Sequence, residues 1–358
     1  MSTVSSKFNT FKKHIETITT IIKDKVSQNP VLIVSHYDAD GLTSAAILLD
    51  LLLHKGISFH LKIVEQIDRD LITFLKETKY PYIILLDLGS GTLKILSQIE
   101  KEIFILDHHH PSVYKETVGK IRILNPHLLG IDGSTEISTS GITYFLAKNM
   151  DESKSDKYIV PAIIGALGDR QDIGPHFRLI GLNEIIVKEG LEKGIIKAKI
   201  GLRLYGLTRH PLVKALEYTM DPFIPGLSGD ENACLLFFKK IGISPVKNNK
   251  LRYFSSLSRE EVKKLATELI KYAISKGVSV KDAERLFGMK YYILLEEENT
   301  MFYDARDYSI VINACGRMER YDLAILLLNN YISREEIFNK VLEVVKEYRK
   351  NIAQFLEK

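Results

Sequence analysis

The chain has 358 residues, of which 45% are hydrophobic and 26% are charged, and its formal net charge at pH 7 is +4. This length and composition predict a soluble globular protein with two domains, or one large domain with an appendage. Acidic and basic residues are mixed along the chain, which excludes a basic tail. No apolar run approaches the roughly 18 residues of a membrane helix, and the first residues lack the apolar core of a signal peptide. We therefore expect a cytoplasmic protein without membrane contact.

The first half of the chain alternates helical patterns with short apolar runs. Residues 5–28 carry apolar side chains at helical spacing, and Asn29-Pro30 ends the pattern. Continuous apolar strands that alternate with helices predict a parallel sheet covered on both faces, and thus an α/β fold. Strands are expected at 31–34, 57–65, 81–86, 103–106 and 122–124. Helices are expected at 42–54, 71–77, 138–150 and 158–167.

The rest of the chain combines helical patterns with loops and shorter apolar runs. Residues 181–220 look helical, residues 151–157 look like a loop, and residues 221–230 contain two Pro and two Gly, which is typical of a linker. Capping-box sequences begin at Ser258 and Ser333 and predict a helix after each. Residues 289–295 resemble a strand, residues 304–313 a helix, and residues 323–328 fit either. These patterns predict a first domain over 1–215, a linker over 216–248 and a smaller α/β domain over 249–358.

Acidic and histidine side chains follow four of the elements in the first half, at the point where each element ends. The carboxyl ends of parallel strands meet at one edge of a sheet, so we expect these side chains to lie close together. Carboxylates gathered at one edge would repel each other unless cations lay between them, and two divalent ions about 3.5–4 Å apart meet that need. Oxygen and imidazole ligands suit Mn²⁺ or Mg²⁺. An acidic turn with helix-capping Asp residues is the structural alternative. The set comprises His36, Asp38, Asp40, Asp87, Asp107, His108, His109 and Asp169.

The combination of these motifs resembles the DHH phosphoesterase superfamily. The motifs are His36-x-Asp38-x-Asp40-Gly41, Asp87, Asp107-His108-His109 and Gly168-Asp169. Within the superfamily the chain is most similar to archaeal RecJ-like nucleases, which it also resembles at 87–91, 125–133, 221–227 and 313–318. The resemblance extends from about residue 30 to about residue 320.

The resemblance implies a centre of two Mn²⁺ ions, with Mg²⁺ as the alternative metal. In this centre Asp87 bridges the two ions and acts in catalysis. His109 faces the scissile phosphate as a hydrogen-bond donor or acid, and Asp107 orients the neighbouring histidines. The implied ligands of one ion are His36, Asp38 and Asp87. The implied ligands of the other ion are Asp40, Asp87, His108 and Asp169.

The resemblance also implies a second domain of the DHHA1 type, which closes a cleft over the metals and binds nucleic acid. The usual glycine- and histidine-rich signature of that domain is replaced here by 313–317. A guanidinium and a nearby backbone N–H suit a phosphate oxygen. The alternatives are a surface salt bridge for the arginines, a helix N-cap for the serine and a structural role for the histidine. The candidates for substrate binding are Asn313, Gly316, Arg317, Arg306, His127 and Ser138.

The function that the resemblance implies is Mn²⁺-dependent removal of nucleotides from an end of single-stranded DNA or RNA, in DNA replication or repair. One alternative is a phosphodiesterase of the nanoRNase type, which hydrolyses short oligonucleotides. Another is a replisome scaffold that binds GINS and the replicative helicase with little or no catalysis. All the implied metal ligands are present, which favours an enzyme that also docks to such a complex.

Overall fold

The computed structural model describes residues 2–329 and 333–356, and these residues divide into two compact units. The first unit contains 2–173, 179–193, 309–329 and 333–352, and the second contains 174–178, 194–308 and 353–356. This division differs from the expected one, which placed all of 249–358 in a second domain. Within residues 309–352, the described residues join the first unit, where helix α13 (Tyr321–Asn329) packs on helix α2 (Ala39–His54).

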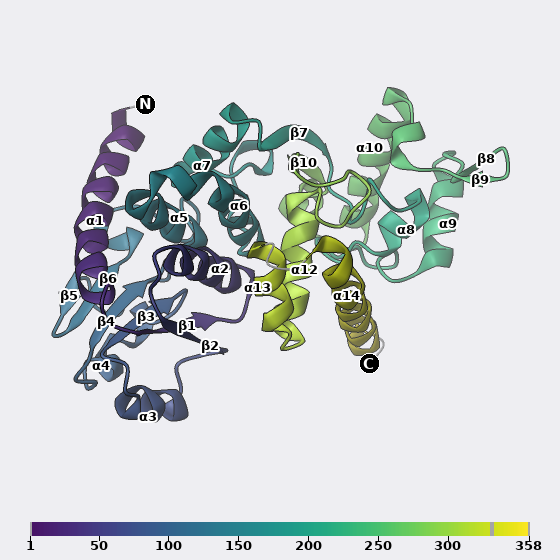
Figure 1. Cartoon of the computed structure of the whole chain (residues 1–358). Helices are drawn as coiled ribbons and strands as arrows, with labels where there is room; N and C mark the ends of the chain where they lie inside the picture. The colour runs from purple at the N-terminus through teal and green to yellow at the C-terminus, as the bar shows by residue number, and fades with distance from the viewer. Residues whose placement is uncertain (1, 330–332, 357–358) are drawn as a thin grey trace. The chain divides into compact units, whose positions relative to one another are not determined.

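A six-stranded sheet lies at the centre of the first unit, with strand order β2-β1-β3-β4-β6-β5 (Figure 1). All neighbouring strands are parallel except β5, which runs antiparallel to β6. The strands β1, β3 and β4 consist mainly of Val, Ile, Leu and Phe and are buried almost throughout, as expected for a sheet covered on both faces. The predicted α/β fold is confirmed. The strands are β1 (Val31–His36), β2 (Phe59–Val64), β3 (Tyr82–Leu86), β4 (Glu102–Leu106), β5 (Thr117–Val118) and β6 (Ile121–Leu124).

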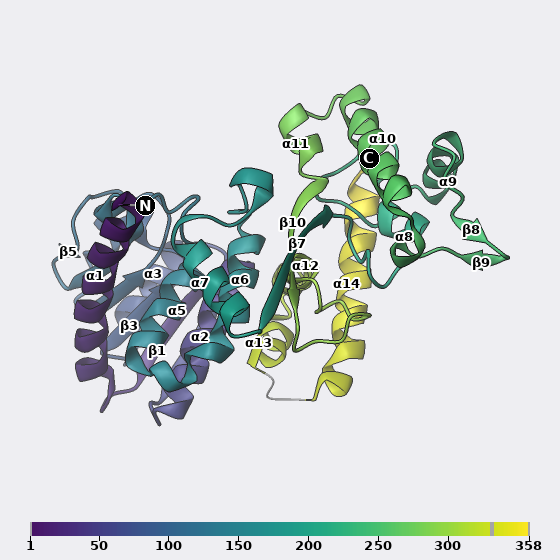
Figure 2. The same cartoon turned by 90° about the horizontal axis from the view of Figure 1, so that it is seen from above.

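Helices cover both faces of this sheet (Figures 1 and 2). On one face, α3 and α4 pack leucine side chains against alternate residues of the strands. On the other face, α1, α2 and α5 contact the sheet, and α6 packs on α2 and α5. The helices of this part are α1 (Ser2–Val26), α2, α3 (Arg69–Glu77), α4 (Leu93–Leu96), α5 (Thr139–Met150), α6 (Ile159–Gly168) and α7 (Gly181–Glu192).

Helices α12, α13 and α14 lie near the end of the chain, and short 3-10 helices occupy several loops. Helix α12 (Ala305–Arg317) begins in the second unit and continues in the first. The apolar run 323–328, which fitted either a strand or a helix, lies in α13. Residues 152–158 form a 3-10 helix where a loop was expected, and α14 (Arg334–Leu356) follows the predicted cap at Ser333. The 3-10 helices of the first half are η1 (Ser90–Thr92), η2 (Pro126–Leu129), η3 (Glu152–Tyr158) and η4 (Pro175–Phe177).

The second unit contains an antiparallel pair of strands, β7 (Ile196–Leu202) and β10 (Phe287–Ile293). The prediction of helix throughout 181–220 was wrong for β7, because pairing with a strand far along the chain decides its conformation. Residues 216–248 are not a simple linker, since Phe237 and Phe238 of α9 lie in the apolar core of this unit. The predicted capping box at Ser258 is confirmed. The remaining elements are α8 (Leu212–Glu217), α9 (Glu231–Lys240), β8 (Val246–Lys247), β9 (Lys250–Leu251), η5 (Phe254–Ser256), α10 (Arg259–Ser275) and α11 (Val280–Glu284).

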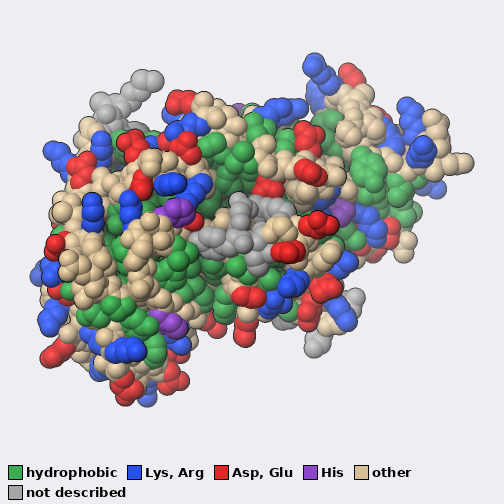
Figure 3. Space-filling model, viewed as in Figure 1, with side chains coloured by type: hydrophobic (Ala, Val, Ile, Leu, Met, Phe, Trp, Pro, Cys, Tyr) green, Lys and Arg blue, Asp and Glu red, His purple; other side chains and the backbone are tan. Residues whose placement is uncertain are grey.

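The surface carries both signs of charge. Figure 3 shows Lys and Arg side chains interspersed with Asp and Glu side chains over the face that it draws. None of the helices within residues 2–329 and 333–356 has both the length and the apolar composition to cross a bilayer.

Candidate metal centre

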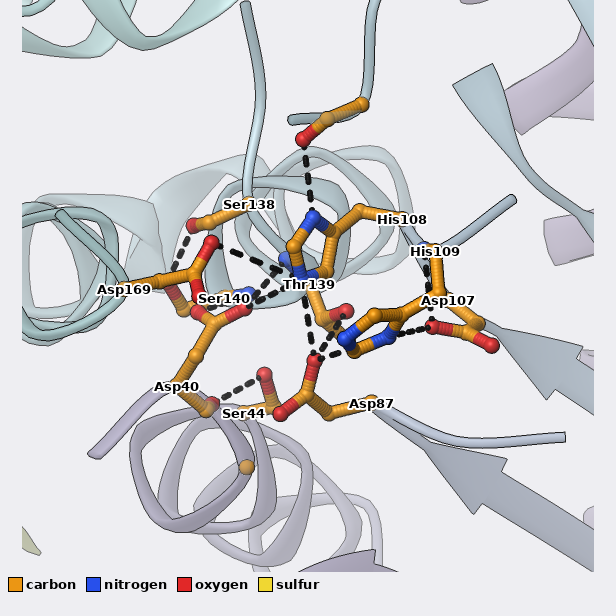
Figure 4. A network of polar contacts seen from close by, with 12 residues as sticks. Asp40, Ser44, Asp87, Asp107, His108, His109, Ser138, Thr139, Ser140 and Asp169 are labelled. Carbon is orange, nitrogen blue, oxygen red and sulfur yellow. Dashed lines mark hydrogen bonds and ion pairs between the residues drawn. The ribbon is translucent and has the colours of Figure 1, made fainter. Parts of the chain in front are cut away.

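The acidic and histidine side chains selected from the sequence meet at the carboxyl edge of the parallel sheet. Figure 4 shows several of them directed toward one another from the ends of neighbouring strands and helices. His36 ends β1, and Asp38 and Asp40 lie at the start of α2. Asp87 and the 107–109 segment follow β3 and β4, and Asp169 directly follows α6. These side chains therefore lie close together at one edge of the sheet, as the order of strands and helices predicted.

Asp87 lies at the middle of the cluster and faces two groups of donors. Its Oδ2 is 3.3 Å from Nδ1 of His36, and its Oδ1 is 3.3 Å from Nε2 of His108. Oδ1 also accepts a hydrogen bond of 3.0 Å from the Thr139 hydroxyl. The backbone of Asp87 is left-handed, with φ of 64°, a conformation that costs about 1–3 kcal/mol and concentrates at functional sites. Burial raises the pKa of Asp87, but His108 and His36 outweigh it and hold the pKa below its usual range.

The first group of donors consists of His36, Asp38 and Asp87, with one atom from each lying within 4.8 Å of the others. Nδ1 of His36 is 3.1 Å from Oδ2 of Asp38. This nitrogen is buried and has no hydrogen-bond partner among the residues that the structure describes. Burial lowers the pKa of His36, but the carboxylates of Asp38 and Asp87 raise it to about 10. A cation between the three side chains would replace the proton that the two carboxylates otherwise attract.

The second group surrounds another ring nitrogen that lacks a hydrogen-bond partner among the described residues, Nε2 of His108. Nδ1 of His108 donates to the carbonyl oxygen of Gly133 at 2.8 Å, so in the neutral ring Nε2 carries the lone pair. Nε2 is buried, lacks a hydrogen-bond partner within the described part of the chain, and lies 3.3 Å from Asp87. It is also 3.5 Å from Oδ2 of Asp169 and 3.8 Å from Oδ2 of Asp40. This tautomer and its hydrogen-bonded carbonyl are typical of a metal-binding histidine.

Asp40 is held by the N-terminus of α5. Its Oδ2 accepts a hydrogen bond from the backbone N–H of Thr139 at 2.7 Å, and its Oδ1 accepts one from that of Ser140 at 2.9 Å. Burial, together with the nearby Asp87, raises the pKa of Asp40 to about 8. Ser138, a candidate for substrate binding, is fully buried, and its Oγ accepts from the N–H of Gly141 as the N-cap of α5. The structure thus places Ser138 in the capping role that was considered as the alternative.

Asp107 orients His109. Its Oδ1 accepts hydrogen bonds from the backbone N–H of His109 at 3.1 Å and from ring Nδ1 at 2.8 Å. Its Oδ2 accepts from the N–H of Ser90 at 2.9 Å, and Asp107 is fully buried. The side chain of His109 is 54% exposed, and Asp107 raises its pKa. His109 therefore lies at the solvent-exposed side of the centre, and the buried carboxylate of Asp107 fixes the orientation of its ring.

Two buried polar residues, Gln171 and Asn183, support the centre, and no motif in the sequence points to either of them. Nε2 of Gln171 donates to Oδ2 of Asp169 at 2.9 Å and to the carbonyl oxygen of Gly133 at 2.8 Å. Its Oε1 accepts from Nδ2 of Asn183 at 2.7 Å. Neither Gln171 nor Asn183 is among the candidates selected from the sequence. Gln171 lies in the polar stretch 168–172 and Asn183 in the first turn of α7, and only their burial separates them from surface amides.

The remaining candidates lie apart from the two groups of donors. His127 stacks on His110 at 3.9 Å between ring centroids, and burial lowers its pKa. Arg306 belongs to the second unit, where it pairs with Asp221. Arg317 is exposed, lies 5.6 Å from the ring centroid of Tyr37 and donates to its hydroxyl at 3.2 Å. Asn313 and Gly316 lie on α12 against the backbone of 37–39.

The donor set fits divalent cations. Carboxylate oxygens and imidazole nitrogens are the ligands that Mn²⁺ accepts, and thiolates do not contribute to either group. Three buried ring nitrogens lack a hydrogen-bond partner among the described residues, Nδ1 of His36, Nε2 of His108 and Nε2 of His127. Those of His36 and His108 face carboxylates of the cluster, so each would be a costly unsatisfied group unless an ion or a proton lay beside it.

Comparison with known families and proteins agrees with this geometry. The model of the DHH family, N-terminal domain, matches residues 30–167, and that of the DHH-CID domain matches residues 204–287. The uncharacterized protein MJ0831 of Methanocaldococcus jannaschii is 31% identical over 352 residues, which cover 96% of this chain and 74% of that protein. The chain belongs to the DHH family. Its second unit matches the DHH-CID domain where the sequence predicted a DHHA1-like domain, and 313–317 lie in the first unit.

Solved structures show the same fold at low sequence identity. This DHH-family chain has a TM-score of 0.51 and 17% identity to the exonuclease RecJ bound to manganese, covering 93% of this chain and 66% of that one. It has a TM-score of 0.64 and 14% identity to CDC45 from Entamoeba histolytica, covering 99% of this chain and 73% of that one. At these identities the similarity establishes the DHH-family phosphoesterase fold and not the activity.

Proposed function

We propose that this DHH-family chain is a Mn²⁺-dependent exonuclease that hydrolyses phosphodiester bonds of single-stranded DNA or RNA from an end, in DNA replication or repair. The observation that carries the proposal is the position of Asp87. Its Oδ2 lies near His36, which also faces Asp38, and its Oδ1 lies near His108, which also faces Asp169. A carboxylate so placed suits a bridge between two cations. The fold that the chain shares with the exonuclease RecJ bound to manganese supports the same assignment.

Each residue of the centre has a role in this proposal. His36, Asp38, Asp40, Asp87, His108 and Asp169 would hold the two cations. When bound, such cations would lower the pKa of a coordinated water molecule and offset negative charge at the phosphate. His109, exposed and held by Asp107, donates a hydrogen bond or a proton to the phosphate group. Asp107 favours the protonated form of His109 because it raises the pKa of that ring.

Digestion of end-labelled oligonucleotides tests the proposal. Single-stranded DNA and RNA, labelled at either end, are incubated with the wild type, with Asp38→Ala and with Asp70→Ala, each with and without Mn²⁺. Asp70 is exposed on α3 and does not belong to the centre, so its variant controls for loss of a carboxylate elsewhere. We expect Mn²⁺-dependent release of labelled mononucleotide by the wild type and Asp70→Ala but not by Asp38→Ala.

Chain lengths down to dinucleotides separate the exonuclease from its enzymatic alternative. Turnover confined to the shortest substrates would instead indicate a phosphodiesterase of the nanoRNase type. If wild type and Asp38→Ala are equally inert on every length, the catalytic proposal fails.

Docking to a replication complex is a second candidate function. The match to the DHH-CID domain and the fold shared with CDC45 support it. Co-purification of the full chain with GINS and the replicative helicase tests the docking, and Asp38→Ala should co-purify as well as the wild type. Loss of catalysis without loss of binding would separate the two functions.

A further inference from the structure

The segment that carries His36, Asp38 and Asp40 has two sides. The three side chains on one side belong to the two groups of donors around Asp87. The residues between them, Tyr37 and Ala39, contact α12 on the other side. Successive side chains of residues 36–40 thus point to alternate sides, so that the cation ligands lie on one side and helix α12 packs on the other.

Asn313 of α12 binds the backbone between two of the ligands. Its Oδ1 accepts a hydrogen bond of 2.9 Å from the N–H of Ala39, which lies between Asp38 and Asp40. This N–H belongs to the first turn of α2, where the backbone donors have no acceptor within the helix. Asp38 satisfies one of these donors by accepting from Gly41 at 3.0 Å, and Asn313 satisfies another. The amide of Asn313 therefore helps to define where α2 begins.

Small residues let α12 approach this segment closely. A Cβ on Gly316 would lie 2.0 Å from the carbonyl oxygen of Tyr37, a distance that side chains do not tolerate. A Cβ on Gly168, the residue before Asp169, would lie 2.5 Å from Cβ of Ala39 and 3.5 Å from Nδ2 of Asn313. Asn313 thus lies where the segments that carry Asp38, Asp40 and Asp169 meet. The close contacts leave no room for these segments to shift independently.

We propose that Asn313 is a positioning residue of the metal centre, which holds the backbone at Ala39 so that Asp38 and Asp40 face their cations. Gly316 allows the contact, and Arg317 covers Tyr37 beside it. The inference rests on the proposed function in one respect, because it requires cations at these carboxylates. It replaces the expectation that Asn313 binds substrate, since its Oδ1 is already committed to the protein backbone.

Three variants test this role. Asn313→Ala removes the acceptor, Asn313→Asp keeps an oxygen at the same place, and Ile310→Ala weakens packing one turn earlier on α12 without removing a polar group. Mn²⁺ affinity is measured by calorimetry, and the environment of the bound Mn²⁺ by electron paramagnetic resonance. Hydrogen exchange at Ala39 is measured without metal. The kcat and KM on a single-stranded oligonucleotide complete the set.

We expect Asn313→Ala to bind Mn²⁺ about 10–100-fold more weakly, as is usual when a group that supports a ligand is lost. Its Mn²⁺ spectrum should change, exchange at Ala39 should accelerate and kcat should fall more than KM rises. Asn313→Asp should recover most of the affinity and of the protection at Ala39. Ile310→Ala should match the wild type in the Mn²⁺ spectrum even if its stability falls.

The outcomes separate this inference from the proposed function. A higher KM for Asn313→Ala, with unchanged Mn²⁺ affinity, spectrum and exchange, would identify a substrate contact and overturn the inference alone. Equal Mn²⁺ binding by wild type and Asn313→Ala would do the same. A wild type that binds no Mn²⁺ would refute the metal centre, and the inference with it. If Asn313→Ala does not fold, the other two variants decide. A Mn²⁺ affinity of Asn313→Asp well below that of Ile310→Ala would then contradict the positioning role of the Asn313 oxygen.

Discussion

Replacement of Gln171 by leucine should weaken the metal centre without touching any of its ligands. Gln171 is fully buried and donates to the carboxylate of Asp169, while its own oxygen accepts from Asn183. Loss of a hydrogen bond to a charged group costs about 1.5–3 kcal/mol, and a buried amide left without an acceptor costs about 1–3 kcal/mol. The two costs overlap, so we expect Gln171→Leu to lower the free energy of unfolding by about 3 kcal/mol and Mn²⁺ affinity by about 10–100-fold.

The loss of affinity should depend on pH. Burial raises the pKa of Asp169 to about 6, and the hydrogen bond from Gln171 opposes that rise. Without Gln171 the pKa of Asp169 rises further, so more of the carboxyl carries a proton that Mn²⁺ must displace. The deficit of Gln171→Leu relative to the wild type is therefore larger near pH 6 than at higher pH.

Calorimetric titration with Mn²⁺ over a range of pH and denaturation in urea together measure these effects. Gln171→Leu, Asn183→Leu and the double variant form a double-mutant cycle, in which the pair should show an interaction energy of about 0.5–3 kcal/mol. An unchanged Mn²⁺ affinity in a folded Gln171→Leu protein would refute the reasoning, because the hydrogen bond to Asp169 would then contribute nothing to the centre.

Three further predictions follow from other buried charges. Asp40 has a pKa of about 8 without metal, so its protonated form stabilises the metal-free protein below that pH, and this contribution is lost as the pH rises through it. Mn²⁺ affinity, measured by calorimetry, should rise over the same range with release of protons, and a constant affinity would contradict this. Asp107 raises the pKa of His109, so Asp107→Asn should lower that pKa. The activity that needs the protonated His109 ring should then be lost at a lower pH than in the wild type. An unshifted pH–rate profile would exclude His109 as the proton donor. Nζ of the buried Lys290 lies 2.8 Å from a carboxylate oxygen of Asp304 in the second unit, so Lys290→Met should lower the free energy of unfolding, measured by urea denaturation, by about 3–5 kcal/mol. Adding Asp304→Asn should restore most of that loss. A double variant as unstable as Lys290→Met would show that the unpaired carboxylate is not the cause.

The metal centre illustrates how far a sequence can predict a site. Side chains that end strands of a parallel sheet must meet at one edge, so the positions of His36, Asp87 and Asp107 after apolar runs already implied a common site. The spacing His-x-Asp-x-Asp similarly implied that alternate residues face one way. These inferences depend on local periodicity and on the right order of strands and helices, which the chain carries in every segment.

Other features were decided by contacts between segments far apart in the chain. The sequence around Asn313 does not indicate whether its amide binds a phosphate or a backbone N–H. The hydrogen bond from the N–H of Ala39 becomes apparent only when α12 packs beside that residue. Gln171 and Asn183 resemble surface amides until their burial is known. The strand β7 fits a helix until it pairs with β10.

Sequence alone determined the α/β order of the first unit and the residues that gather at its sheet edge, because both follow from short-range patterns of apolar and polar side chains. The tertiary structure decided which polar residues support the ligands from behind. A side-chain amide can be buried at low cost only when hydrogen-bond partners surround it, and those partners come from segments far away in the sequence.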